Sequence, residues 1–429
     1  MKTKIFIPVL MALILLTVSS CEDRTFQTFT ANVPVYLSYD ELRKSIGVEE
    51  PAAITKPGKI FFKDNYIFIN EFMEGVHVID ITDPSSPESI GFIPVPGNID
   101  MAIKDSILYL DSYTDLVMID ISDPGAAKEV KRIEDVLAYT LPPYDSDYPL
   151  AIIDEDEGVV TGWEVKEHTQ EIQKNPYPWP IFWEYSSDSF RSNMGSSVGG
   201  GAGGSAYGIG GSMARFLTYD NYLYMLQETY QLKVLDISDT ESPELIYEKY
   251  VGWGLETMFI YEGYMYLGAT NGLYILSLQD PKSPFTTSVY SHITSCDPVV
   301  VSGNLAYVTL RSGNMCGGTA DLLEVINVSD KYHPQLIASY GMNEPYGLGI
   351  ADNILFICQG DNGLVVYDAT DPMTITSNKL SEFTDIRATD VIPVNNFLFT
   401  IGDSGFYIYD YSDINDIHQI GSIPVSDSD

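Results

Sequence analysis

The sequence predicts an all-β fold: a seven-bladed β-propeller of four-stranded blades, with a long insertion between blades two and three. Three observations favour this fold. A short apolar motif occurs seven times along the 429 residues, and its copies are spaced by about 41 residues once two insertions are set aside. Each period holds four short alternating apolar runs divided by turn-forming residues. Four such strands with their turns need about 40 residues, which is the size of one propeller blade.

The repeated motif is an alternating apolar run followed by a polar residue at the start of a turn. Two copies read GVHVIDITDP at residues 75–84 and LVMIDISDP at 116–124. We predict that the first polar residue caps the turn between the third and fourth strands, because an Asp carboxylate accepts nearby backbone N–H bonds. A lone Asp pair in each turn would offer calcium too few oxygens. The seven capping positions are Asp80, Asp120, Asp236, Ser277, Asn327, Asp368 and Asp410.

A second pattern predicts the hairpin turn between the first and second strands. Pairs of residues that tolerate a positive φ occupy this place in six copies, and such pairs favour tight hairpins. The pairs are Asp64-Asn65, Asp220-Asn221, Glu262-Gly263, Gly303-Asn304, Asp352-Asn353 and Asn395-Asn396.

The run LVMIDISDP resembles the LVIVD repeat, which is found in secreted and lipid-anchored β-propeller proteins of bacteria. The resemblance extends over residues 56–429 apart from the insertions, although Ser277 and Asn327 depart from it at the first Asp. It implies a propeller fold and a place in the cell envelope. It implies little about activity.

The N-terminus is typical of a secretory signal peptide at residues 1–20. Lys2 and Lys4 precede an apolar run of 14 residues, which is too short for a permanent membrane helix. The segment ends in Val-Ser-Ser before Cys21 and resembles the lipobox of bacterial lipoproteins, which implies cleavage before Cys21 and a diacylated thiol. An ordinary signal peptide is the alternative.

Glu22 and Asp23, directly after the Cys, resemble a signal for export to the outer face of the outer membrane. The alternative is a lipoprotein that faces the periplasm.

The mature chain divides into a tether and N-terminal segment at 21–55 and a propeller domain at 56–429. Within the first segment, Val33 to Leu37 alternates enough to form a strand. The long insertion occupies about residues 134–213, and a shorter one occupies 311–321. Propeller topology places both on the same face, and extra length on one face of a repeat protein often marks the binding side.

The net charge of -37, from 60 acidic and 23 basic residues, argues against nucleic acid as a partner. It argues equally against adsorption to anionic lipid, so contact with the membrane is expected through the lipid anchor alone. We expect no cofactor.

Candidate ligand residues fall into two groups on the face that carries the insertions. All four Trp residues, Trp163, Trp179, Trp183 and Trp253, map there and would either stack on sugar rings or pack as a lid. Polar residues recur near the start of the first strand, where they would form either a ligand-binding ring at the channel mouth or a solvated rim. These residues are Lys59, Asp100, Arg215, Asp297 and Asp390.

Metal and covalent features are weak. Asp154 and Asp156 in an acidic run before Gly158 faintly resemble a calcium loop, with a hairpin turn as the alternative. Cys296 and Cys316 could form a disulfide that closes the short insertion, since the envelope is oxidising. No nucleophile-elbow or zinc-protease motif is present, and no catalytic residue is assigned.

The sequence therefore predicts a lipid-anchored envelope propeller that acts as a non-enzymatic binding or assembly scaffold for an unknown envelope protein. The alternative is a surface protein that binds or processes glycans with its aromatic insertion face.

Overall fold

The computed structural model describes residues 26–171, 209–210, 212, 214–240, 242–292, 298–312 and 318–426. The signal peptide, Cys21, Trp179, Trp183, Cys296, Asp297 and Cys316 lie outside these residues. No helix among the described residues is long and apolar enough to cross a bilayer.

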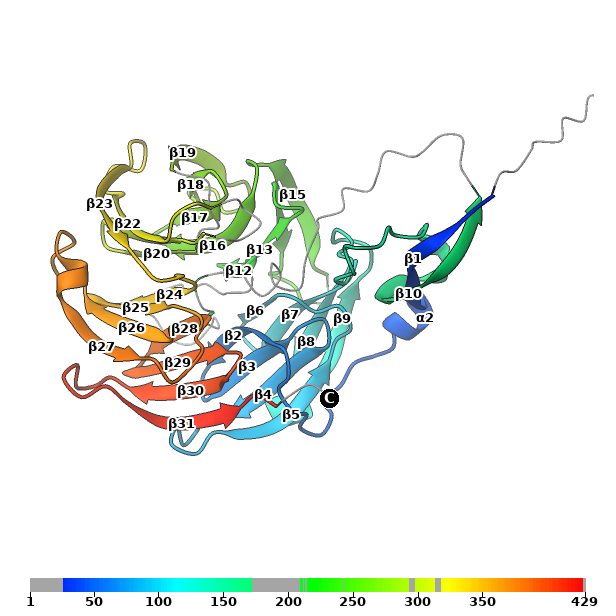
Figure 1. Cartoon of the computed structure of the whole chain (residues 1–429), viewed down its shortest axis with the longest axis horizontal. Coiled ribbons are helices and arrows are strands. Elements are labelled where there is room, and N and C mark those ends of the chain that lie inside the picture. Colours follow the sequence, from blue (N-terminus) through cyan, green and yellow to red (C-terminus); the bar gives the residue numbers. More distant parts are fainter. Residues whose placement is uncertain are drawn as a thin grey trace, which may run out of the picture.

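The predicted fold is confirmed: seven antiparallel four-stranded blades form a ring (Figure 1). Blade 1 holds β2 (Pro57–Lys63), β3 (Tyr66–Glu71), β4 (Gly75–Asp80) and β5 (Glu88–Pro94). Blade 2 holds β6 (Met101–Lys104), β7 (Ile107–Ser112), β8 (Asp115–Asp120) and β9 (Lys128–Ile133). Blade 3 holds β12 (Phe216–Tyr219), β13 (Tyr222–Gln227), β14 (Gln231–Asp236) and β15 (Glu244–Tyr250).

The remaining blades follow without a break in the repeat. Blade 4 holds β16 (Leu255–Tyr261), β17 (Tyr264–Ala269), β18 (Gly272–Ser277) and β19 (Phe285–Ser291). Blade 5 holds β20 (Val299–Ser302), β21 (Leu305–Leu310), β22 (Leu322–Asn327) and β23 (Gln335–Gly341). Blade 6 holds β24 (Leu348–Ala351), β25 (Ile354–Cys358), β26 (Leu364–Asp368) and β27 (Lys379–Phe383). Blade 7 holds β28 (Asp390–Val394), β29 (Phe397–Gly402), β30 (Gly405–Asp410) and β31 (His418–Pro424).

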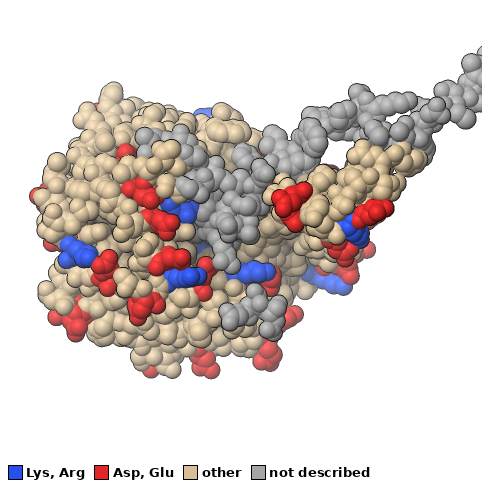
Figure 2. All heavy atoms as spheres, viewed as in Figure 1, with Lys and Arg blue, Asp and Glu red and all other residues tan. Residues whose placement is uncertain are grey.

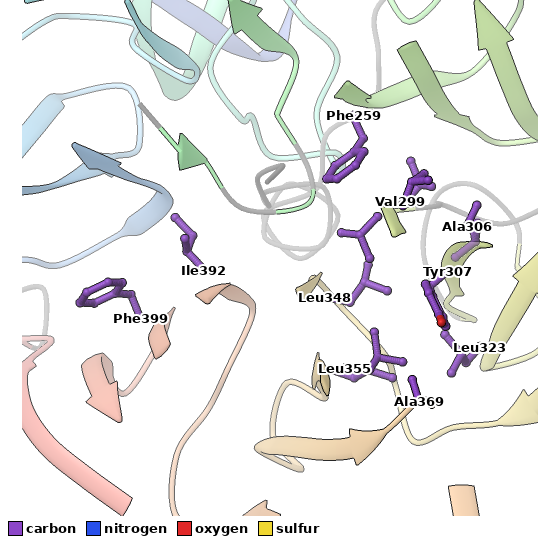
Figure 3. Packing of buried hydrophobic residues seen from close by; sticks show 14 of the residues in the cluster. Phe259, Val299, Ala306, Tyr307, Leu323, Leu348, Leu355, Ala369, Ile392 and Phe399 are labelled. Carbon is purple, nitrogen blue, oxygen red and sulfur yellow. The ribbon is translucent and has the colours of Figure 1, made fainter. Parts of the chain in front are cut away.

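The ring closes between blades 7 and 1 without exchanging a strand, because each blade is one continuous stretch of chain. The innermost strands of neighbouring blades contact one another around the ring, and β28 meets β2. Phe62 stacks on Phe399 across this joint with ring centroids 5.6 Å apart, and Ser426 N donates to Ile54 O at 2.8 Å. Buried side chains such as Val299, Leu348 and Ile392 pack between blades (Figure 3), so the ring is held mainly by apolar burial.

The predicted turn caps are confirmed in all seven blades. Each capping side chain accepts the backbone N–H two residues ahead, at distances from 2.7 Å at Asp80 to 3.2 Å at Ser277. The third and fourth strands also share a register shift at the same place in every blade, which bends each turn in the same way. The turn chemistry of the repeat is therefore uniform.

The predicted first hairpins are also confirmed, with a positive φ at the expected residues. For example, φ is 56° at Asp64, 50° at Asp220 and 51° at Asn395. Asn, Asp and Gly adopt this conformation most readily, which explains why they recur at these positions.

The segment expected to be a tether contains a longer strand than the sequence pattern indicated. β1 (Phe26–Leu37) pairs along its whole length with β10 (Val159–Glu171) from the long insertion, and the pair forms an arm outside blade 2 (Figure 1). The alternation of Val33 to Leu37 covered only the end of β1, because four of the seven residues from Phe26 to Asn32 are polar. A short helix, α2 (Tyr39–Leu42), follows, and the hydroxyl of Ser38 caps it.

A salt-bridge cluster fastens the N-terminal segment to blade 2. The guanidinium of Arg43 donates two hydrogen bonds of 3.0 Å to the carboxylate of Asp115, whose side chain is fully buried. Arg43 also pairs with Glu134 at 2.9 Å and with Asp135 at 3.0 Å. Isolated bridges then tie Gly47 to Lys128 and Glu49 to Phe92, so the chain crosses the outer edges of blades 2 and 1 before β2 begins.

The long insertion leaves blade 2 after Ile133 and rejoins the ring at Phe216. Its last described part includes β11 (Ile209–Gly210), which pairs with β2 as a fifth strand on the channel side of blade 1. Ser212 follows, and its hydroxyl accepts a 2.8 Å hydrogen bond from Leu348 N in blade 6. The return segment of the insertion therefore contacts blades on two sides of the channel. Three short 3-10 helices lie in the described part of the chain, at Pro124–Ala126, Glu155–Glu157 and Ile375–Ser377.

Candidate functional site

The face that carries the second-to-third strand turns and the connections between blades is called the decorated face here. It presents three exposed or half-buried aromatic side chains at blade 3, namely Tyr230, Tyr250 and Trp253, which we call the aromatic platform. Tyr250 is 62% exposed and Trp253 is 51% exposed. The rings of Tyr230 and Trp253 are parallel within 3° with centroids 6.3 Å apart, and the ring of Tyr250 lies 5.9 Å from that of Tyr230.

Local backbone geometry brings these rings together. Tyr230 follows a tight turn in which Glu228 and Thr229 have φ values of 50° and 56°, a conformation that ordinary residues adopt only under constraint. The constraint comes from the next connection between blades: Leu255 N donates to Thr229 O at 2.6 Å, and Val251 N donates to Tyr230 O at 3.0 Å. These bonds hold the connection that carries Trp253 against the turn that carries Tyr230.

Polar groups border the aromatic platform. Glu228 accepts a hydrogen bond from the hydroxyl of Tyr230, which raises the pKa of that phenol. The amide of Gln231 donates to Glu248 at 2.7 Å, and both side chains lie on the adjacent strands β14 and β15. A flat aromatic surface beside carboxylate and amide groups can stack on an apolar ring face and accept hydrogen bonds from hydroxyls.

The first part of the long insertion packs next to the aromatic platform. Ala138 N donates to the side chain of Gln227 at 2.7 Å, and the ammonium of Lys233 donates to Val136 O at 2.8 Å. The insertion and the platform thus share one region of the decorated face.

The structure does not bring the described Trp residues together. Trp163 lies on β10 in the arm, where its indole N–H donates to Pro142 O at 3.0 Å and its ring meets Tyr144 edge-on. It therefore packs against the insertion, whereas Trp253 lies in the aromatic platform. Tyr230 and Tyr250 were not predicted from the sequence, although Tyr230 lies in a turn and Tyr250 at a strand end close to Trp253 in the repeat.

Three of the polar residues expected at the channel mouth are buried, so the interpretation as a solvated rim is wrong for them. Lys59 is 1% exposed, Asp100 is 2% exposed and Asp390 is fully buried. Lys59 on β2 forms an ion pair with Asp100 at the start of blade 2, and Arg215 N donates to the same carboxylate at 2.7 Å. Burial lowers the pKa of Lys59, an effect that Asp100 opposes. These groups join blades 1, 2 and 3.

Asp111, which was not predicted as a site residue, extends this joint between the blades. Its carboxylate accepts hydrogen bonds from Ile99 N at 2.7 Å, Asp100 N at 2.9 Å and the Asn98 side chain at 2.8 Å. Burial raises the pKa of Asp111 to about 6, although these hydrogen bonds act in the opposite direction. The signal that could have revealed it is a polar residue near the end of an otherwise apolar second strand.

Asp390 starts the first strand of blade 7, in the place that corresponds to Asp100 in blade 2. A methyl group at Gly347 of blade 6 would approach its carboxylate to 3.0 Å, which shows how closely the two blades pack there. The thiol of Cys358 is buried nearby; burial raises its pKa, and the charge of Asp390 adds to the shift. The close contact at Asp390 therefore helps to hold blades 6 and 7 together in the ring.

The acidic run in the insertion forms a turn. Asp154 accepts a 3.1 Å hydrogen bond from Asp156 N, and Gly158 closes the turn with φ 123° against the backbone of Leu37. Across the described part of the chain, no three His, Cys, Asp or Glu residues lie close enough together to hold a metal ion.

Comparison with known families gives a direct match. The family described as LVIVD repeat matches residues 58–92, 101–135 and 210–249, which correspond to most of blades 1, 2 and 3. The chain carries LVIVD repeats. The capped turn of these LVIVD repeats continues through blades 4 to 7 in the structure.

Among solved structures, the LVIVD-repeat chain is similar to the computationally designed Ika8 protein, with 12% identity and a TM-score of 0.49 over 93% of this chain and 92% of that one. It is similar to a protein from Lactobacillus plantarum, with 14% identity and a TM-score of 0.49 over 79% and 87%. Sqt1 of Saccharomyces cerevisiae shares 8% identity and a TM-score of 0.49 over 91% and 88%. No curated protein matches the chain.

Proposed function

We propose that this LVIVD-repeat propeller is a binding or assembly scaffold of the cell envelope, anchored by lipid on Cys21, which engages its partner through the decorated face without catalysis. The aromatic platform carries the proposal. Exposed aromatic side chains beside a long insertion are the kind of anchor that dominates binding surfaces. The buried charges Lys59, Asp100 and Asp115 hold the joints of the ring and its N-terminal segment, which supports a binding role over an enzymatic one.

The binding role is tested by site-specific photo-crosslinking in cells. A photoreactive amino acid in place of Trp253 is expected to yield a defined cross-linked adduct between the chain and its partner. The matched control is Tyr332, which is also exposed, at 62% against 51% for Trp253, but lies in a third-to-fourth strand turn on the opposite face. Equal adduct patterns from the two positions would contradict a role for the decorated face.

The proposed anchor and location rest on the lipobox pattern before Cys21 and on Glu22 and Asp23. Metabolic labelling with a fatty acid is expected to modify the chain, and Cys21→Ala is expected to abolish the label. Surface exposure predicts that protease added to intact cells cleaves the anchored chain. Protection of the chain in intact cells would instead support the periplasm-facing orientation.

A glycan is the second candidate partner, and the composition of the aromatic platform favours it. Parallel aromatic rings with Glu228, Gln231 and Glu248 nearby match the chemistry of sugar recognition, in which ring faces stack and hydroxyls donate to carboxylates. The net charge of -37 supports a neutral or cationic ligand over nucleic acid, and the Lys and Arg side chains visible in Figure 2 are interspersed with Asp and Glu.

Binding to a glycan array distinguishes the two candidates. If the ligand is a glycan, Trp253→Ala should weaken binding about 30-fold, which corresponds to about 2 kcal/mol for a stacked anchor. Tyr332→Ala should leave binding unchanged. Retention of full glycan binding by Trp253→Ala would exclude the aromatic platform as the site.

A further inference from the structure

The arm has one open edge. β1 and β10 form a separate two-stranded sheet, and among the described residues no other strand pairs with β10. The outer edge of β1 is partly covered, because Asn32 N donates to Pro149 O and Ala151 N donates to Asn32 O, each at 2.9 Å. A long open edge presents unpaired backbone groups that recruit another strand.

The hydrogen bonds of Asn32 reveal which groups of β10 face the open edge. Asn32 uses both its N–H and its C=O on the side away from β10, so its pair with Val165 is not hydrogen-bonded. The N–H and C=O of Val165 therefore also point away from β1, toward the open edge. Because strand geometry alternates, the backbone groups of Trp163 and Glu167 point the same way.

The side chains along this edge are complementary to themselves in one register. Glu164 and Lys166 flank Val165, are 60% and 53% exposed and pair with each other at 2.6 Å. If two copies of β10 pair antiparallel about a two-fold axis at Val165, each Glu164 lies opposite Lys166 of the other copy. The adjacent registers with the same backbone pattern would place Glu164 opposite Glu164 or Lys166 opposite Lys166, which is unfavourable.

We propose that the chain forms a homodimer through β10, which creates a continuous four-stranded sheet of two arms. The backbone groups of residues 163–167 supply about six hydrogen bonds, since each hydrogen-bonded pair exchanges two. Val165 is 44% exposed and lies on the axis, and the interface is isologous as a two-fold dimer requires. The arm stands outside the ring, so the ring leaves this edge accessible (Figure 1).

Charge reversal tests the register. Analytical ultracentrifugation of the mature chain carrying Cys21→Ser is expected to show a monomer–dimer equilibrium. Glu164→Lys and Lys166→Glu should each raise the dissociation constant about 5- to 30-fold, because each places two like-charge pairs across the interface. The double variant Glu164→Lys/Lys166→Glu should restore the dimer. Lys44→Glu, which reverses an exposed charge near the root of the arm, is the control and should have no effect.

Disulfide trapping provides a second measurement that does not depend on affinity. Residues opposite each other in a pair without hydrogen bonds have Cα atoms about 4.5 Å apart, within disulfide range. An oxidised mixture of Glu164→Cys chains and Lys166→Cys chains should give a cross-linked pair, whereas each variant alone should not. A chain that stays monomeric, a double variant that fails to restore association, or cross-linking of either variant alone would overturn the proposal.

Discussion

Contacts that recur in every blade differ in kind from contacts made once. The capped turns join residues two apart and are repeated seven times. The contacts that fix the decorated face and the arm are single: Lys59 and Asp100 lie 41 residues apart, and Arg43 and Asp115 lie 72 apart. Repeated contacts are local and individually weak, whereas neither single contact is duplicated in the blades as far as the structure describes them. Substitutions in the two sets should therefore have effects of different size.

The largest effect is expected at the buried ion pair. Lys59→Met removes the cation and leaves the carboxylate of Asp100 buried without its counter-charge, which should lower the free energy of unfolding by about 3 to 5 kcal/mol. Denaturant unfolding measures this change. Lys44→Met removes an exposed lysine and should cost less than about 0.5 kcal/mol. Equal stability of the two variants would show that the joint between blades 1 and 2 contributes nothing.

A smaller and more local effect is expected at Arg43. Arg43→Ala leaves Asp115 with Arg132 at 3.3 Å as its remaining cation, and we expect a loss of about 2 kcal/mol. Hydrogen exchange should rise in residues 26–49 and stay unchanged in blades 4 to 7. Arg43→Lys keeps the charge but loses the paired geometry, so it should have an intermediate effect. Uniform exchange changes over the whole ring would argue against a local clamp.

The sequence predicted the repeated contacts well, because they depend on short spacing. The caps, the hairpin turns and the number of blades all follow from residues within one period. It could not predict the partners of Lys59 or Trp163, because those depend on how distant segments meet. The buried joint shows the limit most clearly: charged residues at the start of a strand are usually solvated, and only the neighbouring blade reveals that Lys59 and Asp100 neutralise each other.

The pH dependence of the joint should come partly from Asp111. Its raised pKa, about 6, means that between about pH 4 and pH 6 the folded chain holds a proton that the unfolded chain has released. The contribution of Asp111 to the free energy of unfolding therefore falls as pH rises through this window. Partial exposure of the residue screens the effect, so we expect a total of about 1 to 2 kcal/mol.

Unfolding of Asp111→Asn isolates this contribution. The variant keeps an oxygen that accepts from Ile99 N and Asp100 N but cannot ionise. The difference in stability between the parent chain and the variant should change with pH between 4 and 6 and stay constant above 7. Parallel stability curves would assign the pH dependence to other groups.

The smallest effect is expected at a single repeated cap, and it is the sharpest test of the comparison. Asp410 accepts from Ser412 N at 2.8 Å, and Asn327 makes the same contact to Ser329 N at 2.9 Å in blade 5. Asp410→Asn should therefore be nearly neutral at pH 7, while Asp410→Ala should cost about 0.5 to 1 kcal/mol.

The cap should also depend on pH. The hydrogen bonds that Asp410 accepts from Ser412 lower the pKa of its carboxyl group. The stabilising contribution of the cap is therefore fully present above the ordinary pKa of Asp and is lost as pH falls through the lowered value. Denaturant unfolding at pH 7 and at pH 3 should show a difference between Asp410→Ala and the parent chain that shrinks on acidification. A cost near that of Lys59→Met would mean that one turn has no substitute among the other six, and the distinction between repeated and single contacts would fail.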